Sequence, residues 1–105
     1  MKIREILGTS GIRGPAMQHF VRDDSGYMRW LAQHPDGYVI NTYSTPSASY
    51  LKLHRATCAS ISRLQANATT FTEGEYSKLC GDRAELQRYA QRLGGAAQPC
   101  PNCLG

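Results

Sequence analysis

The sequence predicts a single small α+β domain, in which a small antiparallel sheet is accompanied by two or three helices. Two observations carry this prediction. Segments 38–43 and 50–54 are β-branched, aromatic or alternating in polarity, which is typical of strands. Segments 26–34 and 82–93 place apolar residues three and four positions apart, which is typical of helices. The chain has 105 residues, 41% of them hydrophobic, which suffices for one modest core.

Residues 1–24 are expected to form a flexible N-terminal arm that precedes a single domain at 25–105. Three glycines, Gly8, Gly11 and Gly14, fall within seven residues here, and Pro15 follows them. Regular structure is costly at such positions. The glycine spacing does not predict a phosphate-binding loop, because no strand clearly precedes it.

The domain is expected to begin with a helix at 26–34. Asp24 and Ser25 can cap its first turn. Its apolar stripe consists of Tyr27, Trp30 and Leu31. The indole of Trp30 is most simply a core anchor, and a Pro-Asp-Gly turn ends the helix.

The segments at 38–43 and 50–54 are expected to pair as a hairpin across the polar loop 44–49. After the hairpin, the pattern predicts a short helix and two further strands, at 58–64, 67–71 and 75–80. A last helix follows Asp82, because Glu85 three residues on completes a capping box. Its apolar stripe consists of Leu86, Tyr89, Ala90 and Leu93, and two glycines end it.

Two pairs of potential metal ligands stand out in the second half of the chain. His54 and Cys58 are four residues apart, and the terminal Cys100 and Cys103 form a Cys-x2-Cys pair. Nitrogen and sulfur ligands in two close pairs are typical of a tetrahedral structural zinc site. Cys80 is an alternative to His54, and its simpler interpretation is a small buried core residue. Two disulfides are also possible, but no secretory leader is visible, so reduced thiols and metal are favoured.

The order of strand, His-x3-Cys, short helix, strand, helix and Cys-x2-Cys resembles the small zinc domains related to the N-terminal metal-binding domain of Ada-type DNA repair proteins. The resemblance covers roughly 50–104, and the acidic stretch 72–75 echoes one that precedes the final helix in relatives. It implies bound zinc and a DNA partner. The chain departs from the pattern in its longer interval between the ligand pairs and in Cys80.

The formal net charge of +4 is compatible with a nucleic-acid surface. Six basic residues are the candidates for phosphate contacts: Lys52, Arg55, Arg63, Arg83, Arg88 and Arg92. For the three arginines of the last helix, a solvated helix face is the simpler interpretation. The alternative function is a structural or protein-interaction domain with a purely structural zinc ion. No stretch is apolar enough to span a membrane, so a cytoplasmic protein is expected.

Catalysis is not expected. In the Ada-type proteins a zinc-bound thiolate accepts a methyl group from DNA, and the resemblance implies that Cys58, Cys100 or Cys103 would have to take this role. Hydrolysis on zinc would need an open coordination position and a neighbouring carboxylate. Four protein ligands fill the expected site, and no Glu neighbours them in the sequence.

Overall fold

The fold is α+β, as the sequence predicts, and the computed structural model describes residues 17–64 and 69–104. The expected glycine-rich part of the arm lies outside the described residues. The elements in chain order are β1 (Gln18–Phe20), α1 (Asp24–Gln33), β2 (Tyr38–Tyr43), β3 (Lys52–Arg55), α2 (Ala59–Ser62), β4 (Tyr76–Gly81), α3 (Arg83–Arg92) and β5 (Gln98–Pro99).

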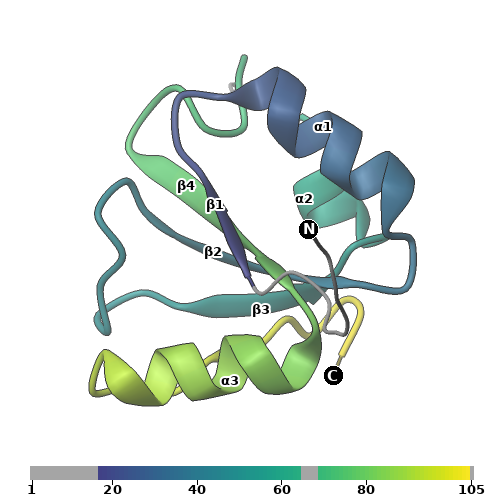
Figure 1. Cartoon of the computed structure of the whole chain (residues 1–105). Helices are drawn as coiled ribbons and strands as arrows, with labels where there is room; N and C mark the ends of the chain where they lie inside the picture. The colour runs from purple at the N-terminus through teal and green to yellow at the C-terminus, as the bar shows by residue number, and fades with distance from the viewer. Residues whose placement is uncertain (1–16, 65–68, 105) are drawn as a thin grey trace, which may run out of the picture.

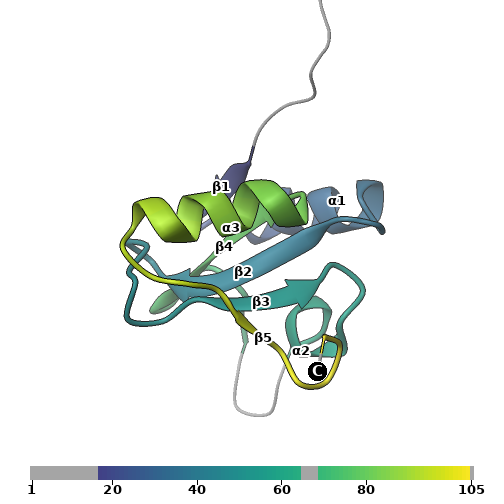
Figure 2. The same cartoon turned by 90° about the horizontal axis from the view of Figure 1, so that it is seen from below.

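The five strands form one sheet in the order β1-β4-β2-β3-β5. All neighbouring pairs are antiparallel except β3 and β5, which are parallel. Figure 2 shows how this comes about: after α3 the chain turns back, runs alongside β3 and ends close to α2. The carboxy-terminal segment is therefore attached to the edge of the sheet that β3 would otherwise form.

The sheet separates two layers of core. On one side, α1 and α2 cover a cluster that includes Tyr27, Trp30, Val39 and Cys80. On the other side, α3 covers a cluster of aliphatic residues that includes Leu86. Trp30 is buried, so its predicted role as a core anchor is confirmed.

The predicted hairpin is confirmed. β2 and β3 are antiparallel, with Val39 opposite His54 and Ile40 opposite Leu53. Residues directly opposite each other in an antiparallel pair point to the same face of the sheet. His54 therefore lies on the face covered by α1 and α2, whereas Leu53 packs toward α3.

The last helix also follows its prediction. The carboxylate of Asp82 accepts a hydrogen bond from the backbone N–H of Glu85 at 2.8 Å. Leu86 and Ala90 are buried on the sheet side of α3. Gly94 follows with a φ of 91°, a left-handed conformation that glycine adopts without strain.

Two segments differ from the prediction at the N-terminal side. Residues Gln18–Phe20 fall within the expected arm, but they form β1 and pair with β4, with His19 opposite Leu79. Helix α1 begins at Asp24 rather than at residue 26, and its N-cap is Asp23, whose side chain accepts from the backbone N–H of Gly26 at 2.9 Å. A three-residue strand without clear alternation of apolar and polar residues cannot be recognised from the local sequence.

The prediction of a strand at 67–71 is wrong for residues 69–71, which the structure describes, because residues 69–75 form an irregular loop. The β-branched Thr70 and Thr72 form hydrogen bonds in this loop instead of pairing in a strand. Their hydroxyls, with the backbone N–H groups of Phe71 and Thr72, donate to the carboxylate of Asp24 at 2.6–3.3 Å. Burial alone would raise the pKa of Asp24, but these hydrogen bonds outweigh it, so the pKa lies below its ordinary value.

Replacing this carboxylate should weaken the fold. Asp24→Asn is expected to lower the free energy of unfolding by about 2 kcal/mol at pH 7, because hydrogen bonds to a charged group are lost. A depressed pKa stabilises the fold above the unfolded value of about 3.9, and this stabilisation disappears as the pH falls through the lower folded value. Urea titrations at pH 7 and pH 3 measure both effects. Asp36→Asn, at an exposed position, is the matched control, and an equal loss in both variants would contradict the assignment.

Candidate metal centre

The first pair of ligand residues is brought together by a tight turn. His54 lies near the end of β3, and the backbone N–H of Cys58 donates to the carbonyl of Arg55 at 3.0 Å. This turn reverses the chain immediately after the strand. Cys58 is the N-cap of α2, in extended conformation, and its Sγ lies 4.0 Å from Sγ of Cys100.

The second pair arrives with the carboxy-terminal segment. The parallel register places Lys52 beside Gln98 and Leu53 beside Pro99, so Cys100 follows next to His54. The backbone N–H of Cys100 donates to the carbonyl of Leu53 at 2.8 Å. A turn then closes with hydrogen bonds from the N–H groups of Cys103 and Leu104 to the carbonyl of Cys100.

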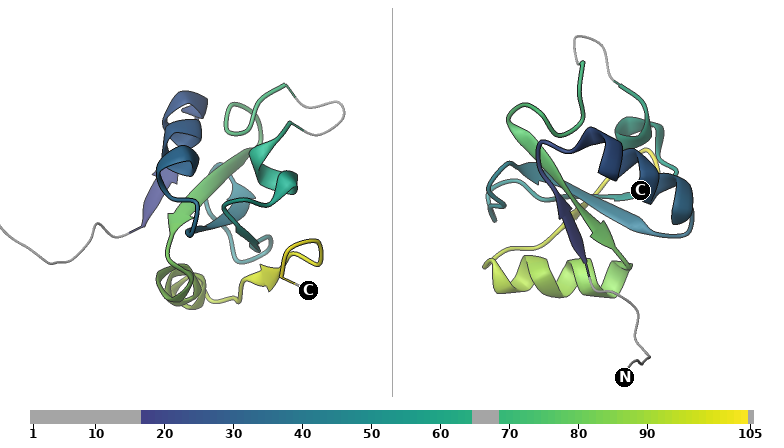
Figure 3. Two further views of the ribbon diagram at one scale, coloured as in Figure 1. Left: turned by 90° about the vertical axis from the view of Figure 1, so that its right-hand side faces the viewer. Right: turned by 45° about the horizontal axis from the view of Figure 1, so that its top comes forward.

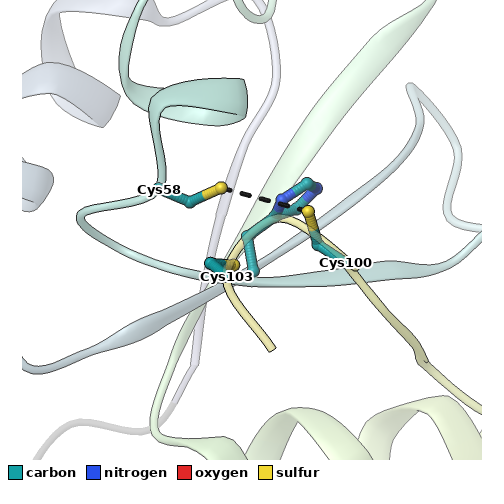
Figure 4. A group of neighbouring side chains, drawn as sticks. Cys58, Cys100 and Cys103 are labelled. Atoms are coloured by element: carbon teal, nitrogen blue, oxygen red, sulfur yellow. Dashed lines mark hydrogen bonds between the residues drawn. The ribbon is translucent and has the colours of Figure 1, made fainter. Parts of the chain in front are cut away.

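The four ligand atoms of His54, Cys58, Cys100 and Cys103 lie within 4.8 Å of one another. Figure 4 shows the sulfurs of the three cysteines turned toward a common space, with Cys58 Sγ and Cys100 Sγ 4.0 Å apart. Two sulfurs bound tetrahedrally to one zinc ion, each about 2.3 Å from it, lie about 3.8 Å apart. The spacing therefore suits a tetrahedral ion, and the predicted ligand pairs do meet.

His54 supplies the most specific feature of the group. Its side chain is buried, and its Nδ1 has no hydrogen-bond partner among the described residues. Burial, with the neighbouring positive charges of Lys52 and Lys78, lowers the pKa of His54 to about 4. At neutral pH the ring is therefore uncharged, which is the form that binds a metal ion. A buried nitrogen without a partner is otherwise costly, and a bound ion would satisfy it.

The three thiols influence one another. The pKa of Cys103 is raised to about 11: burial raises it most, the hydrogen bond from the backbone N–H of Arg55 lowers it, and the neighbouring Cys58 and Cys100 raise it. For Cys100, burial also acts upward, but hydrogen bonds from Asn102, Cys103 and Cys58 outweigh it, so its pKa is lowered. Three ionised thiols this close repel one another, and a divalent cation among them would remove that repulsion.

Arg55 supports the group from outside it, a role that sequence reasoning missed. Its backbone N–H donates to Cys103 Sγ at 3.3 Å, and its Nε donates to the carbonyl of Cys103 at 3.1 Å. Groups that hold metal ligands in place commonly donate hydrogen bonds in this way. The sequence offered one signal for this role: Arg55 directly follows the candidate ligand His54 on a strand, and a residue next to a ligand borders the site.

Cys80 does not belong to the group. It is fully buried on β4, packed in the core layer beneath α1, and burial raises its pKa above the ordinary value. The expected interpretation as a small core residue therefore agrees with its place in the fold. All four cysteines are free thiols, so neither of the two possible disulfides is formed.

The six basic residues expected at a nucleic-acid surface are divided among three places. The guanidinium carbons of Arg55 and Arg83 both lie 5.8 Å from the centre of the Tyr38 ring. Arg88 and Arg92 line a hollow beside α3. Lys52 and Arg63 belong to the opposite side of the sheet: Lys52 is opposite Asn41 in the register, and Arg63 lines a hollow with Asn41.

One further cation was missed. Lys78 lies on β4 and is only 5% exposed, and its Nζ donates to the carbonyl of Phe71 at 2.7 Å. Burial lowers its pKa to about 8, partly offset by the charge of Asp24. The alternation of β4 was a signal, because it places Lys78 on the same face as Cys80.

None of the helices within the described residues is long and apolar enough to cross a membrane. The chain was also compared with models of protein families, with curated proteins and with solved structures. None of these comparisons finds a match.

Proposed function

We propose that this protein is a small zinc module in which His54, Cys58, Cys100 and Cys103 bind one structural zinc ion. The observation that carries the proposal is the buried imidazole of His54, grouped with three free thiols and with its Nδ1 lacking a hydrogen-bond partner among the described residues. Imidazole nitrogen and thiolate sulfur are the ligands that zinc prefers in structural sites. Four protein ligands would leave no position for a water molecule, so the ion would stabilise the fold and catalyse no reaction.

Metal content tests the ligand set. The wild type, purified in zinc-supplemented medium, is expected to carry one zinc ion per chain by elemental analysis. His54→Ala and Cys100→Ala should lose most of it, because three ligands bind far more weakly than four. His34→Ala and Cys80→Ala are the matched controls and should retain the ion. His54→Cys should retain it as well, because it restores a fourth ligand.

The proposal would be wrong if His54→Ala and Cys100→Ala kept a full equivalent of zinc while folded. It would also be wrong if Cys80→Ala lost the ion. The His54→Cys variant separates loss of a ligand from loss of the fold, because it changes the side chain at the same buried position.

Removal of the ion should destabilise one part of the molecule selectively. A zinc concentration about a thousand times the dissociation constant contributes about 4 kcal/mol to folding stability. Chelation is therefore expected to lower the melting temperature and to increase hydrogen exchange at β5 and at the turn before α2. The amides of β2 and β4, which pair over six residues each, should remain protected. Uniform loss of protection across the sheet would contradict a zinc ion that stabilises only β5 and the turn before α2.

Nucleic acid is the partner that we propose for this module. The specific observation in its favour is the exposed pair of guanidinium groups of Arg55 and Arg83, which share the ring of Tyr38. The net charge of +4 has the sign that attracts phosphate. The likeness of the ligand pattern to Ada-type zinc domains points to the same class of partner. A structural or protein-interaction module is the alternative, since a zinc-stabilised fold needs no further ligand.

Binding to nucleic acid should depend steeply on salt. Fluorescence anisotropy with a labelled DNA oligonucleotide, from 50 to 200 mM salt, gives the slope of log affinity against log salt. Arg83→Ala should reduce that slope by about one, because one phosphate contact is lost. Arg29→Ala, an exposed arginine of α1, is the matched control. Absence of binding at low salt would remove this partner and leave the structural module.

A further inference from the structure

Three tyrosines gather at the end of the sheet that lies away from the metal centre. Tyr43 and Tyr76 are opposite each other on β2 and β4, and their rings stack with centroids 5.7 Å apart. The ring of Tyr50 lies 5.6 Å from Tyr43 and 5.8 Å from Tyr76. We call these three residues the tyrosine face.

This aromatic surface is open to solvent. Tyr43 is 39% exposed and Tyr76 is 41% exposed. With Leu64, they are three of the four exposed large hydrophobic side chains among the described residues. Figure 1 shows that α1 and α2 lie over the other end of the sheet, where β2 begins. Aromatic rings left exposed in a cluster are unusual on a surface that binds nothing.

A hollow of about 220 Å³ lies next to the tyrosine face and is lined by Tyr76, Asn41 and Lys78 among others. The Oδ1 atom of Asn41 is buried and has no hydrogen-bond partner among the described residues, while its Nδ2 donates to the hydroxyl of Tyr50 at 3.2 Å. A ligand that donates a hydrogen bond to this buried acceptor would satisfy it.

The charged side chains that line the hollow are basic, and the nearby carboxylate of Asp24 is engaged by Thr70 and Phe71 of the lining. Lys78 and Arg63 line it, and no acidic side chain does so among the residues that the structure describes. Lys52 is directly opposite Asn41 in the register and so lies on the same face of the sheet. Lys78 is 5% exposed, and its Nζ donates to the carbonyl of Phe71 and lies 5.7 Å from the centre of the Tyr27 ring, so it contributes positive charge to the wall of the hollow.

We propose that the tyrosine face and the adjoining hollow bind single-stranded nucleic acid. Bases would stack on Tyr43 and Tyr76, an N–H group of one base would donate to Oδ1 of Asn41, and Lys52 would meet a phosphate. The inference rests on nucleic acid as the proposed partner and names its strand form and its site.

Single strands fit these features better than a duplex or a peptide. Stacking on exposed rings requires bases whose faces are free, which a duplex does not offer. Every base carries an N–H group on its pairing edge, and only in a single strand is that edge available to Asn41. A peptide would satisfy the rings, but it would not match the cations around the hollow unless it were acidic.

Anisotropy titrations with a labelled 12-nucleotide single strand and a hairpin duplex of matched length test the inference. The single strand is expected to bind the wild type at least tenfold more tightly than the duplex. Tyr76→Leu and Tyr43→Leu should each weaken binding of the single strand by roughly five- to a hundredfold, because one stacking contact is lost. Tyr76→Phe keeps the ring and should bind like the wild type.

The controls separate this inference from the proposed partner and from the zinc centre. Zinc content should be unchanged in the tyrosine variants, because both positions lie at the end of the sheet away from the metal centre. The melting temperature should fall only slightly, because one cross-strand ring pair is lost. Equal binding of single strand and duplex, unaffected by Tyr76→Leu but weakened by Arg83→Ala, would overturn the site and leave nucleic acid as the partner. No binding of either form at low salt would overturn both, and it would leave the tyrosine face as a contact for another protein.

Discussion

The attachment of the carboxy-terminal segment to β3 is the constraint on which the arrangement of this molecule depends. β5 contributes only two residues to the sheet, and the N–H groups of Gln98 and of the following Cys100 donate to the carbonyls of Leu51 and Leu53. So short a parallel pairing is weak by itself. The group formed by His54 with three cysteines adds the contacts that fix where the chain ends. A metal ion bound among these side chains would couple the last turn of the chain to the turn before α2.

The elements that the sequence predicts well are those whose determinants are local. Asp82 and Glu85 mark the start of α3 because a cap acts within one turn. The candidate metal ligands were recognisable from their spacing, since two residues on either side of one turn must lie close together. The same argument separates Cys80 from the group, because no partner stands near it in the sequence.

The parts that could not be predicted depend on distant partners. β1 exists because β4 offers an edge to pair with, and three residues carry no alternation that would reveal it. The threonines near residue 70 have high strand propensity, but Asp24, more than forty positions away, holds them in a loop. Lys78 is partly hidden: the alternation of β4 places it on the same face as Cys80, but its contact with the carbonyl of Phe71 depends on how the loop folds. Tertiary contacts override strand propensity in each of these cases.

The last strand also has a protective consequence for the sheet. A bare sheet edge presents unpaired backbone groups that can recruit another chain. β5 covers β3, and Pro99 has no N–H to offer to a further strand. Contacts of Cys100 and Cys103 that hold β5 in place would therefore also keep this edge of the sheet covered. Detachment of this segment would expose the backbone groups of β3 to pairing with a further chain.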